Sequence, residues 1–252
     1  MQNVFIVLPC YNEQQRLQLD LFDELLQTPW LRLLFVDDGS DDGTGQRLQA
    51  YCRRRAGRAE LLTLPRNGGK AEAVRAGMIK ALDQGAEVVG YVDVDFATPV
   101  SEVVRVIEVM EQRGVPVAMG ARVSLLGTSI ERSPVRHYLG RVFATAASLL
   151  LRLRVYDTQC GAKFFRRSPV LRAALEQPFA SRWAFDVELI GRLLEGRDGA
   201  APLSPEAFLE VPLQRWADVG GSKLKPLGML RTGIELLLIG VRHNRSLGRG
   251  RR

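Results

Sequence analysis

Histidine and cysteine are scarce in this chain. Its 252 residues include two histidines, His137 and His243, so a histidine-based catalytic triad has little to draw on. The three cysteines, Cys10, Cys52 and Cys160, are odd in number and far apart in the sequence. That spacing excludes a cysteine zinc site and favours a reducing compartment. No basic, apolar leader precedes the first β-rich segment, so we expect no signal peptide.

Long apolar runs and the common nucleotide signatures are missing as well. The longest apolar runs, Val142–Leu151 and Ile234–Val241, fall short of the roughly 18–20 residues that span a bilayer and are flanked by arginines. They suit buried or interfacial helices. The sequence contains no G-x-G-x-x-G after its first strand, no P-loop and no G-x-S-x-G. The sequence therefore carries no signature of a dinucleotide-binding protein, an ATPase or an α/β-hydrolase.

The composition is that of a basic globular protein. With 46% hydrophobic residues the chain can bury a sizeable core, and its net charge is +7. A basic chain favours an anionic partner, which at this point could be nucleic acid, an anionic membrane or a phosphorylated substrate. The arginine-rich tail Arg242–Arg252 adds to that charge.

Short apolar strands alternate with amphipathic helices over the first 120 residues. This alternation predicts an α/β fold with a doubly wound, mostly parallel sheet. Charged loops follow the strands at their carboxyl ends, where such sheets bind ligands. The predicted strands are Val4–Pro9, Leu31–Val36, Leu61–Leu64, Val88–Val92 and Val115–Met119.

The pattern changes after Arg122. A long helix is predicted over Pro134–Leu153. A polar loop then leads into a strand, and a further helix opens near Arg182. A last amphipathic helix is predicted over Leu227–Val241. The long helix is expected to carry one apolar face, formed by Leu139, Val142, Phe143, Ala146, Leu150 and Leu153.

The stretch Val88–Asp95 is an apolar run that ends in two carboxylates one residue apart, Asp93 and Asp95. Because a strand alternates its side chains, we expect Asp93 and Asp95 to point to the same side, about 6–7 Å apart along the chain. Neighbouring carboxylates repel each other unless a cation lies between them and a ligand, and oxygen ligands favour Mg²⁺ or Mn²⁺ shared with substrate phosphates. The pattern predicts a metal-bridged diphosphate, although a D-x-D pair is also typical of a solvated strand end.

Four clusters follow predicted strands at one sheet edge and together resemble the inverting GT-A-type glycosyltransferases: Pro9–Glu13, Asp37–Thr44, Asn67–Lys70 and Asp93–Asp95. Four more resemble the dolichyl-phosphate β-glucosyltransferase branch of the polyprenyl-phosphate sugar synthases: Gly120–Arg122, Asp157–Gly161, Arg182–Asp186 and Gly221–Lys223. The resemblance spans residues 4 to about 225 and implies a GT-A-like fold.

The resemblance also implies roles for individual side chains. The nucleotide would contact Pro9, Tyr11, Glu13, Asp38, Asp41, Lys70 and Asp93. The metal, Mg²⁺ or Mn²⁺, would bind Asp93 and Asp95, and the acceptor phosphate would bind Arg122, Arg136 and Lys163. We expect Asp157 to act in catalysis by orienting a loop or a basic phosphate ligand, with a general base as the competing role. The other expected site residues are Gln159, Trp183, Asp186, Ser222 and Lys223.

Two positions depart from the pattern of mannosyl relatives. Ala97 stands where these often carry a glutamine near the metal, so Thr98 or water would complete the metal shell. Gly140 stands where they tend to have a serine beyond the acceptor arginine. The membrane anchor or spans of many relatives are not recognisable in the sequence, so we expect peripheral membrane contact.

The implied activity is transfer of glucose from UDP-glucose to a polyprenyl phosphate, of dolichyl or undecaprenyl type, by metal-assisted inverting displacement. Open alternatives are a polyprenyl-phosphate mannosyl- or other hexosyltransferase, a sugar-phosphate nucleotidyltransferase, and a non-catalytic basic module that binds membrane or nucleic acid. For the enzyme we expect no nucleic-acid partner. We expect it at the cytoplasmic, inner face of a membrane, held by anionic lipid through the two long helices and the basic tail.

The expected domain organisation follows the motifs. One glycosyltransferase domain would cover residues 1–225, with a nucleotide-sugar half at 1–122 and an acceptor half at 123–225. An amphipathic helix and basic tail would follow at 226–252.

Overall fold

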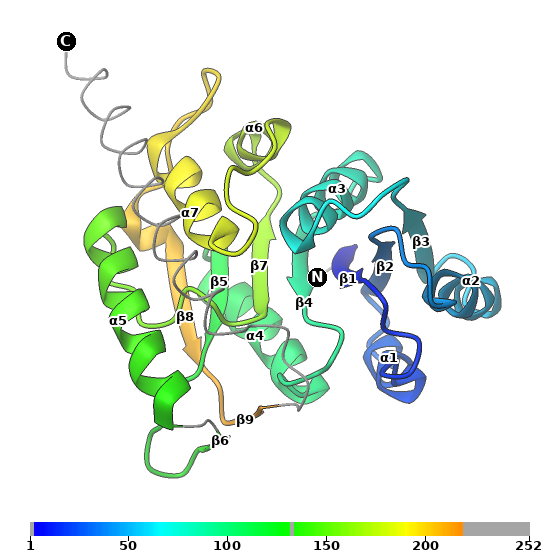
Figure 1. Ribbon diagram of the computed structural model, residues 1–252. Coiled ribbons are helices and arrows are strands. Elements are labelled where there is room, and N and C mark those ends of the chain that lie inside the picture. Colours follow the sequence, from blue (N-terminus) through cyan, green and yellow to red (C-terminus); the bar gives the residue numbers. More distant parts are fainter. Residues whose placement is uncertain (1–2, 132–133, 219–252) are drawn as a thin grey trace.

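A seven-stranded sheet is the centre of the molecule (Figure 1). The computed structural model describes residues 3–131 and 134–218, and for residues 134–136 the backbone alone. The strand order is β3-β2-β1-β4-β7-β5-β8, in which β7 runs antiparallel to both neighbours and the other pairs are parallel. The strands are β1 (Val4–Cys10), β2 (Leu31–Asp37), β3 (Ala59–Thr63), β4 (Val88–Val92), β5 (Val117–Ala121), β7 (Ala162–Arg166) and β8 (Phe208–Pro212).

Helices cover both faces of this sheet. They are α1 (Leu19–Leu26), α2 (Thr44–Arg54), α3 (Lys70–Asp83), α4 (Val100–Arg113), α5 (Pro134–Leu151), α6 (Pro169–Glu176) and α7 (Phe185–Glu195). A 3₁₀ turn, η1 (Pro205–Ala207), precedes β8, and β6 (Ser129–Glu131) pairs with β9 (Arg215–Ala217) as a small second sheet. The predicted mostly parallel α/β sheet is confirmed.

Alternate residues of each central strand enter two separate cores. In β1, Val7 belongs to the core that includes residues of α3, α5, α6 and α7 on one face, whereas Ile6 and Leu8 belong to the core with residues of α1, α2 and α4 on the other. A strand buried on both faces has to be apolar throughout, and this explains the continuous run Val4–Leu8. Figure 1 shows α3, α6 and α7 on one side of the sheet and α1, α2 and α4 on the other.

The position of β7 differs from simple chain order. After α5 the chain returns to the middle of the sheet, where Lys163 pairs with Tyr91 of β4 on one side and with Met119 of β5 on the other. The sequence predicted a strand here but not its place. The insertion carries the 157–161 loop to the end of β4, because the Asp93 N–H donates to the Gly161 carbonyl oxygen at 3.1 Å.

Helix α5 packs on the core through small residues. Ala144 and Ala147 are buried, whereas Leu139 and Val142 are exposed. The predicted apolar face is therefore not wholly part of the core: small side chains allow the helix to approach its neighbours closely, and Leu139 and Val142 remain exposed. No helix among the described residues is both long enough and apolar enough to cross a bilayer. The predicted helix at 227–241 lies outside the described residues.

The three cysteines are free and shielded. Cys10 and Cys160 are buried and Cys52 is half-buried. Burial raises the pKa of the Cys10 and Cys160 thiols, and it raises the pKa of Cys52 to about 11.

Gly90 provides a test of the β4–β7 contact. A Cβ atom at this position would lie 2.1 Å from Cδ1 of Phe164 and 2.4 Å from the Lys163 carbonyl oxygen. Because neither a central strand nor a buried ring can move away, Gly90→Ala should lower the free energy of unfolding by about 3 kcal/mol. Urea unfolding followed by circular dichroism measures this loss.

Gly114→Ala is the matched control. Gly114 ends α4 with a φ of 62°, and a Cβ there would meet no atom within 4 Å. In this control the free energy of unfolding should fall by about 1 kcal/mol, because only the left-handed backbone is strained. Equal losses in the two variants would show that the β4–β7 contact is not tightly packed.

Candidate active site

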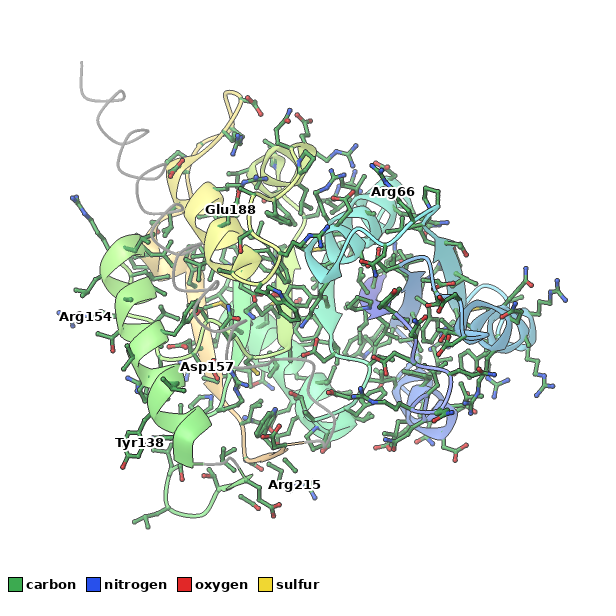
Figure 2. All side chains as sticks on the ribbon, viewed as in Figure 1. Arg66, Tyr138, Arg154, Asp157, Glu188 and Arg215 are labelled. Atoms are coloured by element: carbon green, nitrogen blue, oxygen red, sulfur yellow. The ribbon has the colours of Figure 1, made fainter. Side chains whose placement is uncertain are left out.

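The loops that follow β1, β2 and β4 meet the 157–161 loop at one end of the sheet. Backbone and side-chain hydrogen bonds join them: the Asp38 N–H donates to the Cys10 carbonyl at 2.9 Å, and the Asp93 N–H to Gly161. Figure 2 places Asp157 in the interior of the molecule, between α5 and the sheet. The topology therefore gathers motifs from both halves of the chain, as parallel sheets do at their carboxyl ends.

Asp93 and Asp95 lie in a turn, not in the strand. β4 ends at Val92, and the Phe96 N–H donates to the Asp93 carbonyl at 3.2 Å, with Phe96 at a φ of 51°. The expectation that strand alternation sets the spacing of these carboxylates was wrong. The turn instead fixes Asp95, whose Oδ1 accepts from the Ala97 N–H at 3.1 Å.

Basic residues surround the two carboxylates. Lys70, the first residue of α3, has its Nζ 2.5 Å from Asp93 Oδ1. Arg16 Nη2 lies 3.9 Å from Asp95 Oδ2, and its Nε lies 3.4 Å from Glu13 Oε2. Burial disfavours the ammonium of Lys70, but the charges of Asp93 and other nearby carboxylates prevail and raise its pKa. The sequence analysis missed Arg16, which has no signal beyond following the Pro9–Glu13 motif.

The electrostatics at Asp95 fit a divalent cation. Burial and the neighbouring Asp93 charge raise the pKa of Asp95, so negative charge is held there at a cost that a cation would remove. Both carboxylates remain partly exposed. Among the described residues no group of three or more His, Cys, Asp or Glu side chains is arranged to hold a metal. Asp93 and Asp95 offer two carboxylates, the ligand type of Mg²⁺, which usually keeps water and substrate oxygens as its other ligands.

The loops that follow β1 and β2 are hydrogen-bonded to each other. The Glu13 N–H donates to Thr44 Oγ1 at 2.9 Å, and the Asn12 N–H donates to Ser40 Oγ at 3.0 Å. Asn12 Oδ1 in turn accepts from the Asp41 N–H at 3.1 Å. Glu13 is buried and Tyr11 is exposed beside it. This brings the Pro9–Glu13 motif and Asp41 together at the sheet edge.

Asp38 holds the glycine-rich loop. Its Oδ1 accepts from the Gly68 N–H and its Oδ2 from the Gly69 N–H, both at 2.8 Å. Burial raises the pKa of Asp38, and the two backbone bonds oppose that rise. Asp38 is buried, so in this structure it shapes the loop that leads into Lys70. Contact with the base or ribose stays a prediction for this residue.

Arg122 and Asp157 form a buried two-pronged ion pair. Arg122 Nε donates to Asp157 Oδ2 at 2.6 Å, and Nη2 donates to Oδ1 at 2.8 Å. Although burial opposes both charges, the Arg122 guanidinium holds the pKa of Asp157 well below its usual range. The Arg122 guanidinium also lies over the Trp216 ring, 5.2 Å from its centroid. Asp157 thus orients a basic residue at the site.

Glu210 of β8 holds the backbone on which Asp157 lies. Its two carboxylate oxygens accept from the Tyr156 and Asp157 N–H groups, each at 2.7 Å. The sequence analysis missed Glu210 and Trp216. A charged residue within the apolar strand Leu209–Val211 was the available signal for Glu210, since a strand interior buries a carboxylate only with partners.

Lys163 and Asp186 form a second buried pair. Lys163 Nζ lies 3.0 Å from Asp186 Oδ1, and Gln159 Nε2 donates to Asp186 Oδ2 at 3.2 Å. Burial raises the pKa of Asp186 to about 8 and lowers that of Lys163 to about 8. Lys163 is 1% exposed, so it lies beneath the site. Its predicted contact with an acceptor phosphate stays a prediction.

Gly161 is required where these groups meet. A Cβ atom at this position would lie 2.2 Å from Asp93 Oδ2. Trp183 is partly exposed in the segment before α7. Arg136 belongs to α5, but the structure describes only its backbone. Ser222 and Lys223 lie outside the described residues. Their predicted roles stay predictions.

The sequence is similar to a known family over most of its length. It matches glycosyl transferase family 2 over residues 5–172. It is 32% identical over 256 residues to the dolichyl-phosphate beta-glucosyltransferase of Drosophila melanogaster, covering 94% of this chain and 74% of that protein. It is 30% identical over 260 residues to the enzyme of that name from Homo sapiens, covering 94% and 75%.

Solved structures share the fold. Glucosyl-3-phosphoglycerate synthase from Mycobacterium tuberculosis, with Mn²⁺, UDP-glucose and phosphoglyceric acid, superposes with a TM-score of 0.67 at 18% identity, covering 95% of this chain and 80% of that one. Its complex with Mn²⁺, UDP and glucosyl-3-phosphoglycerate gives a TM-score of 0.68 at 20% identity over the same shares. The likeness confirms the GT-A-like α/β fold.

The Arg122–Asp157 pair generates a prediction with a defined pH dependence. Asp157→Asn leaves a buried guanidinium without its counter-charge and should cost about 3 kcal/mol of stability at pH 7. Because the folded-state pKa of Asp157 is depressed, its stabilisation is complete above about pH 4 and declines as pH falls toward the folded value. Urea unfolding should therefore show a difference in the free energy of unfolding between wild type and variant that is smaller at pH 3 than at pH 7.

Asp83→Asn is the control for this measurement. Asp83 makes an exposed ion pair with Arg172 at 2.7 Å, which should contribute less than about 1 kcal/mol. A variant at Asp157 that loses no more stability than this control would contradict the buried-pair interpretation.

Proposed function

The chain belongs to glycosyl transferase family 2, and from that premise we propose that it transfers glucose from UDP-glucose to a polyprenyl phosphate with inversion at the anomeric carbon. The observation that carries the proposal is the position of β7. It brings Asp157 to the end of the sheet, so that the Arg122–Asp157 pair, suited to an acceptor phosphate, lies at the same end as the Asp93–Lys70 pair, suited to a nucleotide diphosphate. The names of the relatives support glucose and a lipid phosphate as the substrates.

The donor half of the site would use residues 1–122. We propose that Pro9, Tyr11, Glu13 and Asp41 hold the nucleoside, since the first loop brings them together and keeps Tyr11 accessible. Asp38 would act through the loop that it fixes at Gly68 and Gly69. Lys70 would then reach the nucleotide from the start of α3.

Asp93 and Asp95 would hold Mg²⁺ or Mn²⁺ together with the diphosphate. The raised pKa of Asp95 and the partial exposure of both carboxylates fit this shared coordination. The ion would supply charge neutralisation for the departing UDP. The solved structures with Mn²⁺ and UDP-glucose support a divalent metal in this fold.

The acceptor half, residues 123–225 with Arg122, would position the lipid phosphate. Arginine suits this task because its planar fork matches phosphate oxygens. Asp157 uses Nε and Nη2 of Arg122, so the guanidinium is held in one orientation before substrate arrives. Arg136 would be a second phosphate ligand, and Lys163, whose Nζ lies 3.0 Å from Asp186 Oδ1, would contribute positive charge from beneath the site.

A polyprenyl phosphate needs no general base to attack. Its second pKa should lie near that of a phosphoserine, about 6, so at neutral pH it is mostly a dianion. One of its oxygens would form a bond to the anomeric carbon while the bond from that carbon to the UDP oxygen breaks, with the electron pair leaving on UDP. No proton has to be removed, so the protein's task is alignment and charge compensation.

Asp157 and Asp186 are poorly placed to be that base. Both oxygens of Asp157 are engaged by Arg122, and the two oxygens of Asp186 are contacted by Lys163 and Gln159. We therefore propose positioning roles for both carboxylates. We also propose that the enzyme works as a peripheral protein at the cytoplasmic face of a membrane, because its acceptor is a lipid.

The metal proposal predicts that Asp95→Asn lowers kcat by at least about a hundredfold, because compensation of the leaving-group charge is worth several kcal/mol. The product is glucosyl polyprenyl phosphate, detected by mass spectrometry after incubation with UDP-glucose, Mg²⁺ or Mn²⁺, and polyprenyl phosphate. Asp20→Asn, an exposed carboxylate of α1, is the control and should keep full activity. Full wild-type turnover in excess chelator would exclude the role given to Asp93 and Asp95.

If no general base is needed, Asp157→Asn and Asp186→Asn should each lower kcat by less than the 10²–10⁴-fold typical of a missing base. Donor and acceptor affinities are measured separately, so that weaker binding is not counted as a loss of kcat. Rates against pH should rise through about pH 6 with the acceptor and then level off. A thousandfold loss of kcat with both affinities intact, together with loss of the rise in rate on the acidic side of the profile, would show that a carboxylate is the base.

A further inference from the structure

The exposed apolar side chains gather in one part of the molecule. The described residues include eight large hydrophobic side chains that are exposed, and six of them lie between residues 125 and 149. Scattered exposed hydrophobics are normal on soluble proteins, but a cluster of this kind marks an interaction surface. We call it the apolar surface, and its members are Leu125, Leu126, Tyr138, Leu139, Val142 and Leu149.

The first part of the apolar surface is a tight turn with two leucines. Leu126 is completely exposed and Leu125 is about half exposed. Thr128 satisfies both backbone groups of Leu125: its Oγ1 accepts from the Leu125 N–H at 2.9 Å and donates to the Leu125 carbonyl at 2.8 Å, while its own N–H donates to the same carbonyl at 3.1 Å. These internal bonds lower the cost of moving the Leu125 backbone into an apolar medium.

The second part is the outward side of α5. Tyr138, Val142 and Leu149 are spaced by four and seven residues, so they share one side of the helix. Figure 2 shows Tyr138 on the outer side of α5, away from the sheet, with Arg154 on the same side of the molecule. Arg152 and Arg154 are both exposed just after the helix. Figure 1 shows that α5 begins at the end of the molecule where the turn lies.

We propose that the apolar surface docks on an anionic lipid bilayer, with the Leu125–Leu126 turn inserted among the acyl chains. The inference rests on the proposed function, in which the acceptor is a lipid. Leu125 follows Arg122 by three residues, so insertion of the turn would bring the membrane to the residue that binds the acceptor phosphate. The isoprenoid tail could then stay in the bilayer while its phosphate reaches the guanidinium.

The surroundings favour lipid over a second copy of the chain. Arg152 and Arg154 flank the apolar surface, and arginine next to apolar and tyrosine side chains suits the negatively charged interface of a bilayer. A twofold contact between two copies would place the same arginines of both copies around one interface, where their charges repel.

Leu126→Glu tests the turn and Val142→Glu tests the helix. Both side chains are exposed, so the fold should be kept, and circular dichroism checks this. In flotation with vesicles of phosphatidylcholine and phosphatidylglycerol, each variant should bind at least about tenfold more weakly than wild type, because a leucine or valine no longer enters the acyl region. Binding of the wild type should weaken as salt is raised.

Gln49→Glu is the matched control, since it makes the same charge change on α2 at the opposite edge of the sheet. It should bind vesicles within about twofold of wild type. Wild type that does not float, or a Leu126→Glu variant that floats as well as wild type, would overturn the proposal. So would a wild-type dimer that Leu126→Glu dissociates without any change in vesicle binding.

Two acceptors separate this inference from the proposed function. With a water-soluble, ten-carbon prenyl phosphate, Leu126→Glu should turn over at the wild-type rate. With a long polyprenyl phosphate embedded in vesicles, its turnover should fall by at least about tenfold. An equal loss with both acceptors would count against membrane docking by the turn. Failure of the wild type to glucosylate either acceptor would refute the proposed function, whereas flotation tests the docking surface without reference to turnover.

Discussion

Strand β7 hydrogen-bonds to β4 on one side and to β5 on the other, and this antiparallel insertion determines what the end of the sheet can do. A purely sequential parallel sheet would place β5 beside β4 and leave the 157–161 loop elsewhere. With β7 between them, Gly161 contacts the Asp93 backbone and Lys163 lies under the site. Gly90 makes the insertion possible, because any side chain there would overlap Phe164.

The insertion also arranges charge in pairs. Lys70 faces Asp93, and Arg122 faces Asp157. Isolated buried charges are costly, whereas paired ones hold their side chains in fixed orientations. For a reaction in which one phosphate replaces another at a carbon atom, fixed charges are the useful contribution, because they need little rearrangement as negative charge moves from acceptor to leaving group.

Much of the fold could be predicted from the sequence, since local patterns encode it. Apolar strands ending in charged loops predicted the parallel sheet, and the motifs near Asp93 and Asp157 identified residues that the structure brings to one end. Other features depend on tertiary contacts that no local pattern records. The place of β7, the turn at Asp93–Phe96 and the support of Asp157 by Glu210 are of this kind. The small-residue packing of α5 belongs with them, because helical periodicity alone left open whether Val142 packs in the core or lies at an interface.

The burial of the thiols makes the protein suitable for site-specific labelling. The thiolate is the reactive form of cysteine, and burial raises the pKa of the Cys10, Cys52 and Cys160 thiols. A cysteine introduced at an exposed position would therefore react with a maleimide or a nitroxide reagent ahead of the native ones. Spin or fluorescence probes could be attached on either side of the sheet without first removing a native cysteine, and distances within the working enzyme could be followed during turnover.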